Sequence, residues 1–318
     1  MTQNSARKLI LIGCPGPSAR RLEGVEHDIE NIYRYHQTPR AGGWLREEVV
    51  VLVNPDRRQV LDAVGSVQAD FLRVYFSGHG GIRTEIDVKG GLADVTYLEL
   101  WKGEWVRDQE LINPWVRRQE NIMDCCRRRP RGASIGGIPE TLTDIPFTAG
   151  EFWHARRLMD NYIRLSPNGI RFIYAAGCDQ WADDTRSGGA FTVALLNHAL
   201  KNWTDVRQDN LEPRIPGQVP SAIDNPIGMD TLIKQVSADL SLAGRSQQPE
   251  IVNIAGDLHV PFALNSPWPT HHNDGGDLIQ AQRPLWVEPP RRADSAKAIL
   301  TIGAALLGAW LVNEALIR

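Results

Sequence analysis

The sequence predicts an α/β protein built on a mainly parallel sheet flanked by helices. Two observations support this class. Short apolar runs of strand length alternate with amphipathic stretches along the chain, and polar residues gather directly after several of those runs. With 318 residues, the chain is long enough for one large domain or two small ones with a sizeable core. The net charge of −3 gives no global electrostatic case for nucleic-acid binding.

Three strands and two connecting helices are predicted in the first part of the chain. Apolar runs over 8–13, 47–53 and 71–80 have strand length and end at turn signals. Between them, 24–37 and 54–68 carry apolar residues at helical spacing. Strand–helix–strand–helix–strand is the order typical of a parallel sheet with crossover helices.

The second part of the chain extends the same sheet. Strands are predicted over 120–126, 170–179 and 250–256, and helices over 188–203 and 231–243. With the first three, these strands make a six-stranded sheet.

Three regions differ in composition, which predicts a domain over 1–264, a Pro/Gly-rich linker over 265–296 and a hydrophobic helix over 297–318. From Ala298 to Val312 no residue is charged, and basic residues precede this run. The run is longer than the apolar stretch of a typical core helix and shorter than the roughly 20 apolar residues that span a membrane. One reading is a tail anchor with the main domain cytoplasmic. The other is a helix that docks on a protein partner or on itself, and Glu314 argues for it.

The cysteines indicate a reducing compartment. There are four, too few for a disulfide scaffold in a chain of this size, and they form none of the paired CxxC units of a structural zinc site. The first residues run directly into a strand and show no secretory signal. An intracellular protein is therefore expected, and a disulfide between the adjacent Cys125 and Cys126 is not.

Chemically active residues follow three of the predicted strands. The third ends in Ser-Gly-His-Gly (77–80), the fourth in Asp-Cys-Cys (124–126) and the fifth in Cys-Asp-Gln (178–180). Because ligands bind beyond the carboxyl ends of strands in open parallel sheets, His79 and Cys126 are expected to be neighbours.

A cysteine beside a histidine is the minimum for thiol catalysis. The thiolate is the nucleophile, and an imidazole takes its proton and later protonates the leaving amine. The glycines on both sides of His79 let a substrate approach closely, and their backbone N–H groups can stabilise an oxyanion. The alternatives that stay open here are a structural histidine and an inert, packed cysteine.

Together these stretches resemble the caspase-like cysteine peptidases, and most closely the metacaspase branch. FSGHG (76–80) matches the family's histidine motif and DCC (124–126) its Asp-x-Cys motif. LEGVEHD (22–28) looks like the family's first-helix motif, and QQPEIVNIAG (247–256) like its run into the last strand. The resemblance covers about residues 7–264.

The resemblance implies a caspase-like three-layer sandwich and a cysteine endopeptidase. It makes His79 and Cys126 the catalytic pair, with the backbone N–H groups of Gly80 and Cys126 as the oxyanion hole. Cys125 then points to the other face of its strand and packs there, because side chains alternate along a strand. A regulatory or cell-death role acting on protein substrates follows by family analogy alone.

The resemblance also implies an acidic S1 pocket, formed by Asp28, Ser77, Asp124 and Asp179. Converging carboxylates bind a guanidinium through charge-assisted, bidentate hydrogen bonds. Cleavage after Arg is therefore expected, with Lys weaker and Asp excluded. The alternative for Asp28 and Asp179 is an ordinary helix or turn acid.

The run RRRPRG (127–132) departs from the family pattern. It begins a Gly-, Pro- and Thr-rich loop over 127–149, which suits a mobile activation loop. Self-cleavage after Arg131 is one reading, because Pro130 makes the bond after Arg129 a poor target. Solvated arginines are the other.

Other ligands and functions have weaker support. Many metacaspases need calcium, yet the sequence contains no assembled calcium loop, so this requirement stays open. The HisHis pair at 271–272 with Asp274 and Asp277 lies in the predicted linker, which offers a metal no fixed scaffold. The competing function is a catalytically silent caspase-like interaction module that recruits partners through its C-terminal helix. Nucleotide binding has little support, because the turn after the first strand lacks a phosphate-binding motif.

Overall fold

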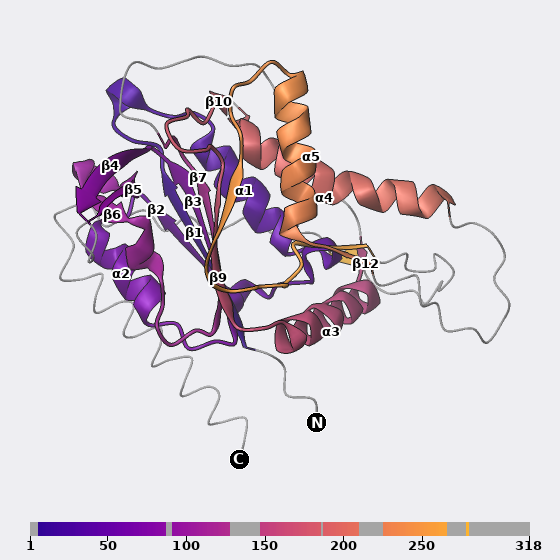
Figure 1. Ribbon diagram of the computed structural model, residues 1–318. Helices are drawn as coiled ribbons and strands as arrows, with labels where there is room; N and C mark the ends of the chain where they lie inside the picture. The colour runs from indigo at the N-terminus through magenta and orange to yellow at the C-terminus, as the bar shows by residue number, and fades with distance from the viewer. Residues whose placement is uncertain are drawn as a thin grey trace, which may run out of the picture. The chain divides into compact units, whose positions relative to one another are not determined.

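The computed structural model describes residues 6–86, 91–127, 147–185, 187–209, 225–265 and 278–279. A six-stranded sheet with the order β13-β9-β7-β3-β1-β2 forms its centre (Figure 1). These strands are β1 (Arg7–Cys14), β2 (Val49–Val53), β3 (Phe71–Gly78), β7 (Arg118–Asp124), β9 (Gly169–Tyr174) and β13 (Glu250–Gly256). Five of them are parallel, and β13 pairs antiparallel with β9. The mixed α/β class and the mainly parallel six-stranded sheet are therefore confirmed.

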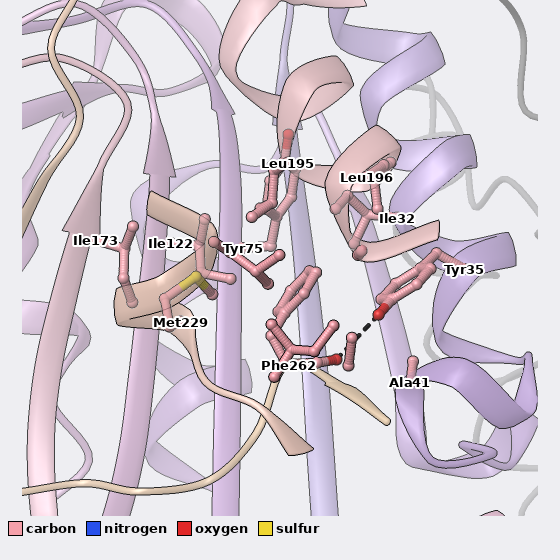
Figure 2. Close-up of a cluster of buried hydrophobic side chains, with 14 of the residues drawn as sticks. Ile32, Tyr35, Ala41, Tyr75, Ile122, Ile173, Leu195, Leu196, Met229 and Phe262 are labelled. Carbon is pink, nitrogen blue, oxygen red and sulfur yellow. Dashed lines mark hydrogen bonds between the residues drawn. The ribbon is translucent and has the colours of Figure 1, made fainter. Parts of the chain in front are cut away.

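Five α-helices are described: α1 (Val25–His36), α2 (Arg57–Gly65), α3 (Ala149–Leu165), α4 (Ala190–Asp209) and α5 (Met229–Leu242). Alternation along the strands sends one set of side chains to each face of the sheet, so the core has two parts. On one face α1, α3, α4 and α5 cover the sheet, and Figure 2 shows part of this cluster, with Tyr75, Ile122 and Ile173 of the sheet near Leu195 and Met229. The result is three layers.

The other face is covered by α2 and by a small sheet that the sequence did not predict. Its antiparallel strands are β4 (Gly80–Ile86), β5 (Leu92–Glu99) and β6 (Trp105–Arg107). Leu98 and Val106 of this sheet and Val60 of α2 pack in one cluster with the strands. β4 begins one residue after His79, so this hairpin holds one side of the histidine segment.

A buried ionic network ties the amino ends of three strands together. Arg73 of β3 donates to Glu120 of β7 over 2.7 Å, and Arg171 of β9 also donates to Glu120. The guanidinium of Arg171 donates further to the carbonyls of Leu258 and Val260. Glu120 is fully buried, so removing its charge would leave Arg73 without this carboxylate and Arg171 with only the more distant Asp230, at 3.7 Å.

Several predicted boundaries shift. The fourth strand ends at Asp124 instead of residue 126, and the fifth ends at Tyr174 instead of residue 179. Helix α3 was missed entirely, although Thr148 and Glu151 form a capping box at its start.

Three short strand pairings are also described. Two of them are β10 (Asp184–Thr185) with β11 (Gly188–Gly189) and β12 (Asn225–Ile227) with β14 (Ala263–Asn265). Within the predicted linker, β15 (Leu278–Ile279) pairs with β8 (Phe147–Thr148). The predicted hydrophobic helix over 297–318 lies outside the described residues. Among the helices that are described, none combines the length and apolar character needed to cross a bilayer.

Candidate active site

A pocket lies at the carboxyl edge of the sheet, where β3 and β7 end. His79, directly after β3, and Cys126, two residues after β7, both line it. The buried acids Asp28 and Asp124 also line the pocket. Its volume of about 30 Å³ has room for one or two water molecules. The parallel topology thus brings the predicted histidine and cysteine to one site, as the positions of the strand ends implied.

His79 is oriented by a backbone carbonyl. Its Nε2 lies 2.6 Å from the carbonyl oxygen of Arg20, in the loop that follows β1. A carbonyl only accepts, so Nε2 carries the hydrogen and donates it. The lone pair of the neutral imidazole is then on Nδ1, which leaves that nitrogen able to act as a base.

Gly80 brings the histidine and cysteine segments together. A Cβ at this position would lie 2.7 Å from Sγ of Cys125 and 2.9 Å from the carbonyl oxygen of Cys126. Any side chain at 80 would therefore push the two segments apart. The two predicted oxyanion donors, the backbone N–H groups of Gly80 and Cys126, belong to these touching segments.

The thiol of Cys126 is engaged by the loop between β9 and β10. Its Sγ lies 3.4 Å from the carbonyl oxygen of Ala182 and 3.3 Å from the Ala182 nitrogen. Burial raises the pKa of Cys126 to about 11, and the charges of nearby acids, Asp124 first among them, add to the effect. In this arrangement the group is a neutral thiol at pH 7. Cys125 is buried in the apolar cluster on the α2 side of the sheet, as strand alternation predicts.

Asp28 and Asp124 are buried next to each other and are satisfied by hydroxyl and amide donors. Ser77 donates to Asp28 over 2.8 Å, and the backbone N–H of Gly189 donates to the other oxygen of Asp28 over 2.8 Å. Thr192 donates to Asp124 over 2.6 Å. Burial raises the pKa of both carboxyls, that of Asp124 to about 7, and the charge of Asp124 raises the pKa of Asp28 further. Each of the two carboxyl groups therefore ionises less readily than a solvent-exposed acid.

Asp179, the fourth predicted pocket residue, is not brought to the pocket. Its side chain is exposed and its backbone is left-handed, with φ of 60°. Because β9 ends at Tyr174, the chain turns before it reaches the site, and the acids that line the pocket from this loop are Asp183 and Asp184. Of the four residues predicted for the S1 pocket, Asp28, Ser77 and Asp124 line this pocket and Asp179 does not.

Arg127, the first residue of the arginine run, is not a solvated side chain. It is only 7% exposed, its guanidinium lies 3.9 Å from the ring centre of Tyr174, and it bonds to Glu250 over 2.7 Å. Its backbone N–H donates to the carbonyl of Gln180 over 3.0 Å. Arg127 therefore anchors the chain directly after the nucleophile candidate. The predicted self-cleavage residue Arg131 lies outside the described residues.

The described part of the chain contains no group of three or more His, Cys, Asp or Glu side chains placed to hold a metal ion. His271, His272, Asp274 and Asp277 lie outside it.

Several residues of the site were missed from the sequence. Thr192 and Asp184 carried no motif of their own, and the Arg20 carbonyl belongs to the backbone and leaves no signal in the sequence. Gly189 was detectable in part: a Gly-Gly pair before a helix is unusual unless the backbone must approach something closely. Here a Cβ at Gly189 would lie 2.2 Å from a carboxylate oxygen of Asp124.

Comparison with known proteins gives matches among solved structures only. No model of a known protein family matches the chain, and neither does any curated protein. The chain is similar to protein GSU0716 from Geobacter sulfurreducens, at 17% identity and a TM-score of 0.48, over 81% of this chain and 99% of that one. It is also similar to caspase-1 from Spodoptera frugiperda, at 14% identity and a TM-score of 0.46, over 81% of this chain and 92% of that one. Function therefore has to be argued from the residues of the site.

Proposed function

We propose that this protein is a caspase-like cysteine endopeptidase that cleaves after Arg, and after Lys less well. The observation that carries the proposal is one pocket that His79 and Cys126 line together with two buried acids, Asp28 and Asp124. Ser77 supports this pair of acids by donating to Asp28. The motif resemblance to metacaspases adds to this geometry and supplies the reaction class.

Substrate binding would use the carboxylates. A guanidinium presents a planar fork of donors that matches carboxylate oxygens, and such bonds are strengthened in a water-poor site. An Asp side chain in the same place would bring another carboxylate next to Asp28 and Asp124, which are already hard to ionise together. Arg is therefore favoured and Asp excluded.

The chemistry follows from the orientation of the imidazole. Nδ1 of His79 takes the thiol proton of Cys126, and the thiolate attacks the carbonyl carbon of the residue bound in the pocket. The oxyanion is stabilised by the backbone N–H groups of Gly80 and Cys126. The imidazolium then protonates the leaving amine, and water hydrolyses the acyl-enzyme. The contacts between Cys126 and Ala182 would have to be released for the sulfur to reach the substrate carbonyl. Burial keeps the thiol in its neutral form, whereas the backbone hydrogen bond with Ala182 lowers its pKa.

Turnover of fluorogenic peptides tests this proposal. Matched peptides ending in Arg, Lys and Asp are compared for the wild type, Cys126→Ala and His79→Ala, with and without calcium. Arg cleavage lost in both variants is expected. Cleavage after Asp, or Arg cleavage that survives Cys126→Ala in purified protein, would overturn the assignment.

A catalytically silent interaction module is the second candidate, and the state of the thiol favours it. Cys126 is bonded to Ala182, and its pKa of about 11 keeps it unreactive in this arrangement. A thiol-directed peptidyl-Arg probe separates the two functions. Labelling of the wild type but not of Cys126→Ala supports the peptidase, whereas no labelling in any buffer supports the module.

Self-processing after Arg131 belongs to the same proposal. Intact mass spectrometry of the wild type and of Cys126→Ala tests it. A wild-type fragment that ends at Arg131 and is missing from the variant is expected. The same fragments from both proteins would exclude self-processing.

Membrane attachment through residues 297–318 is proposed on composition alone, with a cytoplasmic catalytic domain. Membrane fractionation of the full chain and of a chain ending at residue 296 tests it. Loss of the membrane-bound fraction on truncation is expected. If both chains divide equally between the membrane and soluble fractions, membrane attachment is rejected, and the remaining role for residues 297–318 is docking on a protein.

A further inference from the structure

A chain of buried hydroxyl groups leads from the interior of the sheet to Asp124. The hydroxyl of Tyr75, on β3, lies 2.6 Å from Oγ1 of Thr192, and Oγ1 of Thr192 lies 2.6 Å from Oδ2 of Asp124. Tyr75 and Thr192 are fully buried and Asp124 is 5% exposed. Tyr75 itself lies within the apolar cluster shown in Figure 2.

The direction of these hydrogen bonds follows from the carboxylate. An ionised carboxylate only accepts, so Thr192 donates its single hydroxyl proton to Asp124. The oxygen of Thr192 is then free to accept, and Tyr75 donates to it. A backbone hydrogen bond from Thr192 also reaches Asp124, and both bonds lower its pKa against the larger effect of burial. Thr192 is thus the main partner of this acid outside its own strand.

The place of Thr192 in the fold explains why it can orient Asp124. It is the third residue of α4, and α4 starts directly after the Gly188–Gly189 strand. Gly189 lies so close to Asp124 that a Cβ there would be 2.2 Å from a carboxylate oxygen, and its backbone N–H donates to Asp28. One short segment therefore contacts both acids: Gly189 binds Asp28, and Thr192 binds Asp124.

We propose that Thr192 is a positioning residue for arginine recognition: with Tyr75 behind it, its hydroxyl holds Asp124 so that one carboxylate oxygen stays available to a substrate guanidinium. This inference rests on the proposed function, in which Asp124 binds the Arg side chain. Thr192 does not contact the substrate; it acts through Asp124. Valine has nearly the same shape without the donor, and serine keeps the donor, so two variants separate packing from hydrogen bonding.

Ionisable groups from every neighbouring element contribute to the charge around Asp124. They are Asp28 of α1, Tyr75 of β3, Asp184 of β10, and Cys125 and Cys126, which follow Asp124 in the chain, with His79 across the pocket. A change at residue 192 alone leaves all of these groups in the chain, but it alters the hydrogen bonding of both Asp124 and the Tyr75 hydroxyl. A displaced pH profile in a Thr192 variant would therefore reflect the lost hydroxyl.

The first experiment compares turnover of the Arg peptide by the wild type, Thr192→Val and Thr192→Ser across about pH 5 to 9, the range in which Asp124 ionises. Thr192→Val is expected to raise KM about tenfold or more with a smaller change in kcat, because a hydrogen bond to a charged group is lost. The rise of kcat/KM with pH should move to higher pH, and Thr192→Ser should restore both. Thermal melts check that each variant is folded.

The second experiment measures binding without turnover. Anisotropy of a fluorescein-labelled Arg peptide is followed with Cys126→Ala, alone and combined with Thr192→Val or Thr192→Ser. Weaker binding with Val and recovery with Ser are expected. Equal binding by all three proteins, or no preference for the Arg peptide in Cys126→Ala, would overturn the inference. If binding follows the expected order but the wild type cleaves none of the peptides, the peptidase function is rejected, and the role of Thr192 in arginine binding still holds.

Discussion

Replacing Asp124 by Asn should stabilise the protein at neutral pH while weakening recognition of arginine. Asp124 is 5% exposed and lies beside a second buried acid, Asp28. Burial raises its pKa from the ordinary value of 3.8 to about 7. Asn fits the same space, can accept the hydrogen bond from Thr192 and never has to ionise.

The sign and size of the effect follow from proton linkage. Well below the ordinary pKa of 3.8, Asp124 is protonated in both the folded and the unfolded chain, so its ionisation does not affect stability. As the pH rises toward 7, the unfolded chain releases this proton first, and the free energy of unfolding of the wild type falls. Each pKa unit corresponds to about 1.4 kcal/mol, so the full loss is on the order of 4 kcal/mol for an acid of pKa about 7.

The assay is urea unfolding between about pH 4 and 8. Wild type and Asp124→Asn should have similar stability at the acid end, and the variant should become more stable as the pH rises. Asp179→Asn is the matched control, because Asp179 is exposed and outside the pocket. It should follow the wild type within about 0.5 kcal/mol at every pH.

Parallel stability curves for the wild type and Asp124→Asn would refute this reasoning, since they would mean that Asp124 ionises as easily in the folded protein as in water. A variant that is less stable at pH 8 would mean that the carboxylate is paired with a cation. The same variant should lose Arg cleavage, and this opposition between stability and activity is typical of a buried functional acid.

Three further substitutions test other parts of the structure. Gly189→Ala should lower both Tm and Arg turnover, because its Cβ would lie 2.2 Å from an oxygen of Asp124. Gly65→Ala, in open space at the end of α2, should leave turnover unchanged and should not lower Tm in the same thermal-shift and peptide assays. Glu120→Gln should cost about 3–5 kcal/mol in urea unfolding, since two buried guanidinium groups lose the carboxylate that they share; a cost below 1 kcal/mol would contradict the network. Arg127→Ala should reduce kcat while leaving the Arg-over-Lys preference intact, because it anchors the chain after Cys126, and unchanged kcat would count against that role.

Much of the fold was predictable because it is encoded locally. Apolar runs of strand length alternating with helical periodicity are enough to place the strands of a parallel sheet, and the six central strands lie within a few residues of the predicted ranges. The predictions failed where local patterns are weak. Helix α3 follows a stretch without periodicity. The β4–β6 sheet was missed although Gly90-Gly91, between the first two of its strands, is a turn signal.

The sequence by itself determined the edge at which the site forms. His79 and Cys126 follow parallel strands, and the ends of parallel strands meet whatever lies between them in the chain. It also separated Cys125 from Cys126, because side chains alternate along a strand and the first cysteine then faces the core.

Only the tertiary structure decided which groups complete the site. Asp184 lines the pocket and Asp179 does not, because the exact end of β9 sets how far the following loop must travel. Thr192 reaches Asp124 across 68 positions of sequence, and His79 is oriented by a backbone carbonyl that has no residue signature. Hydrogen bonds of this kind form only when segments distant in sequence are placed to within a few tenths of an ångström. The packing of the whole domain sets that placement.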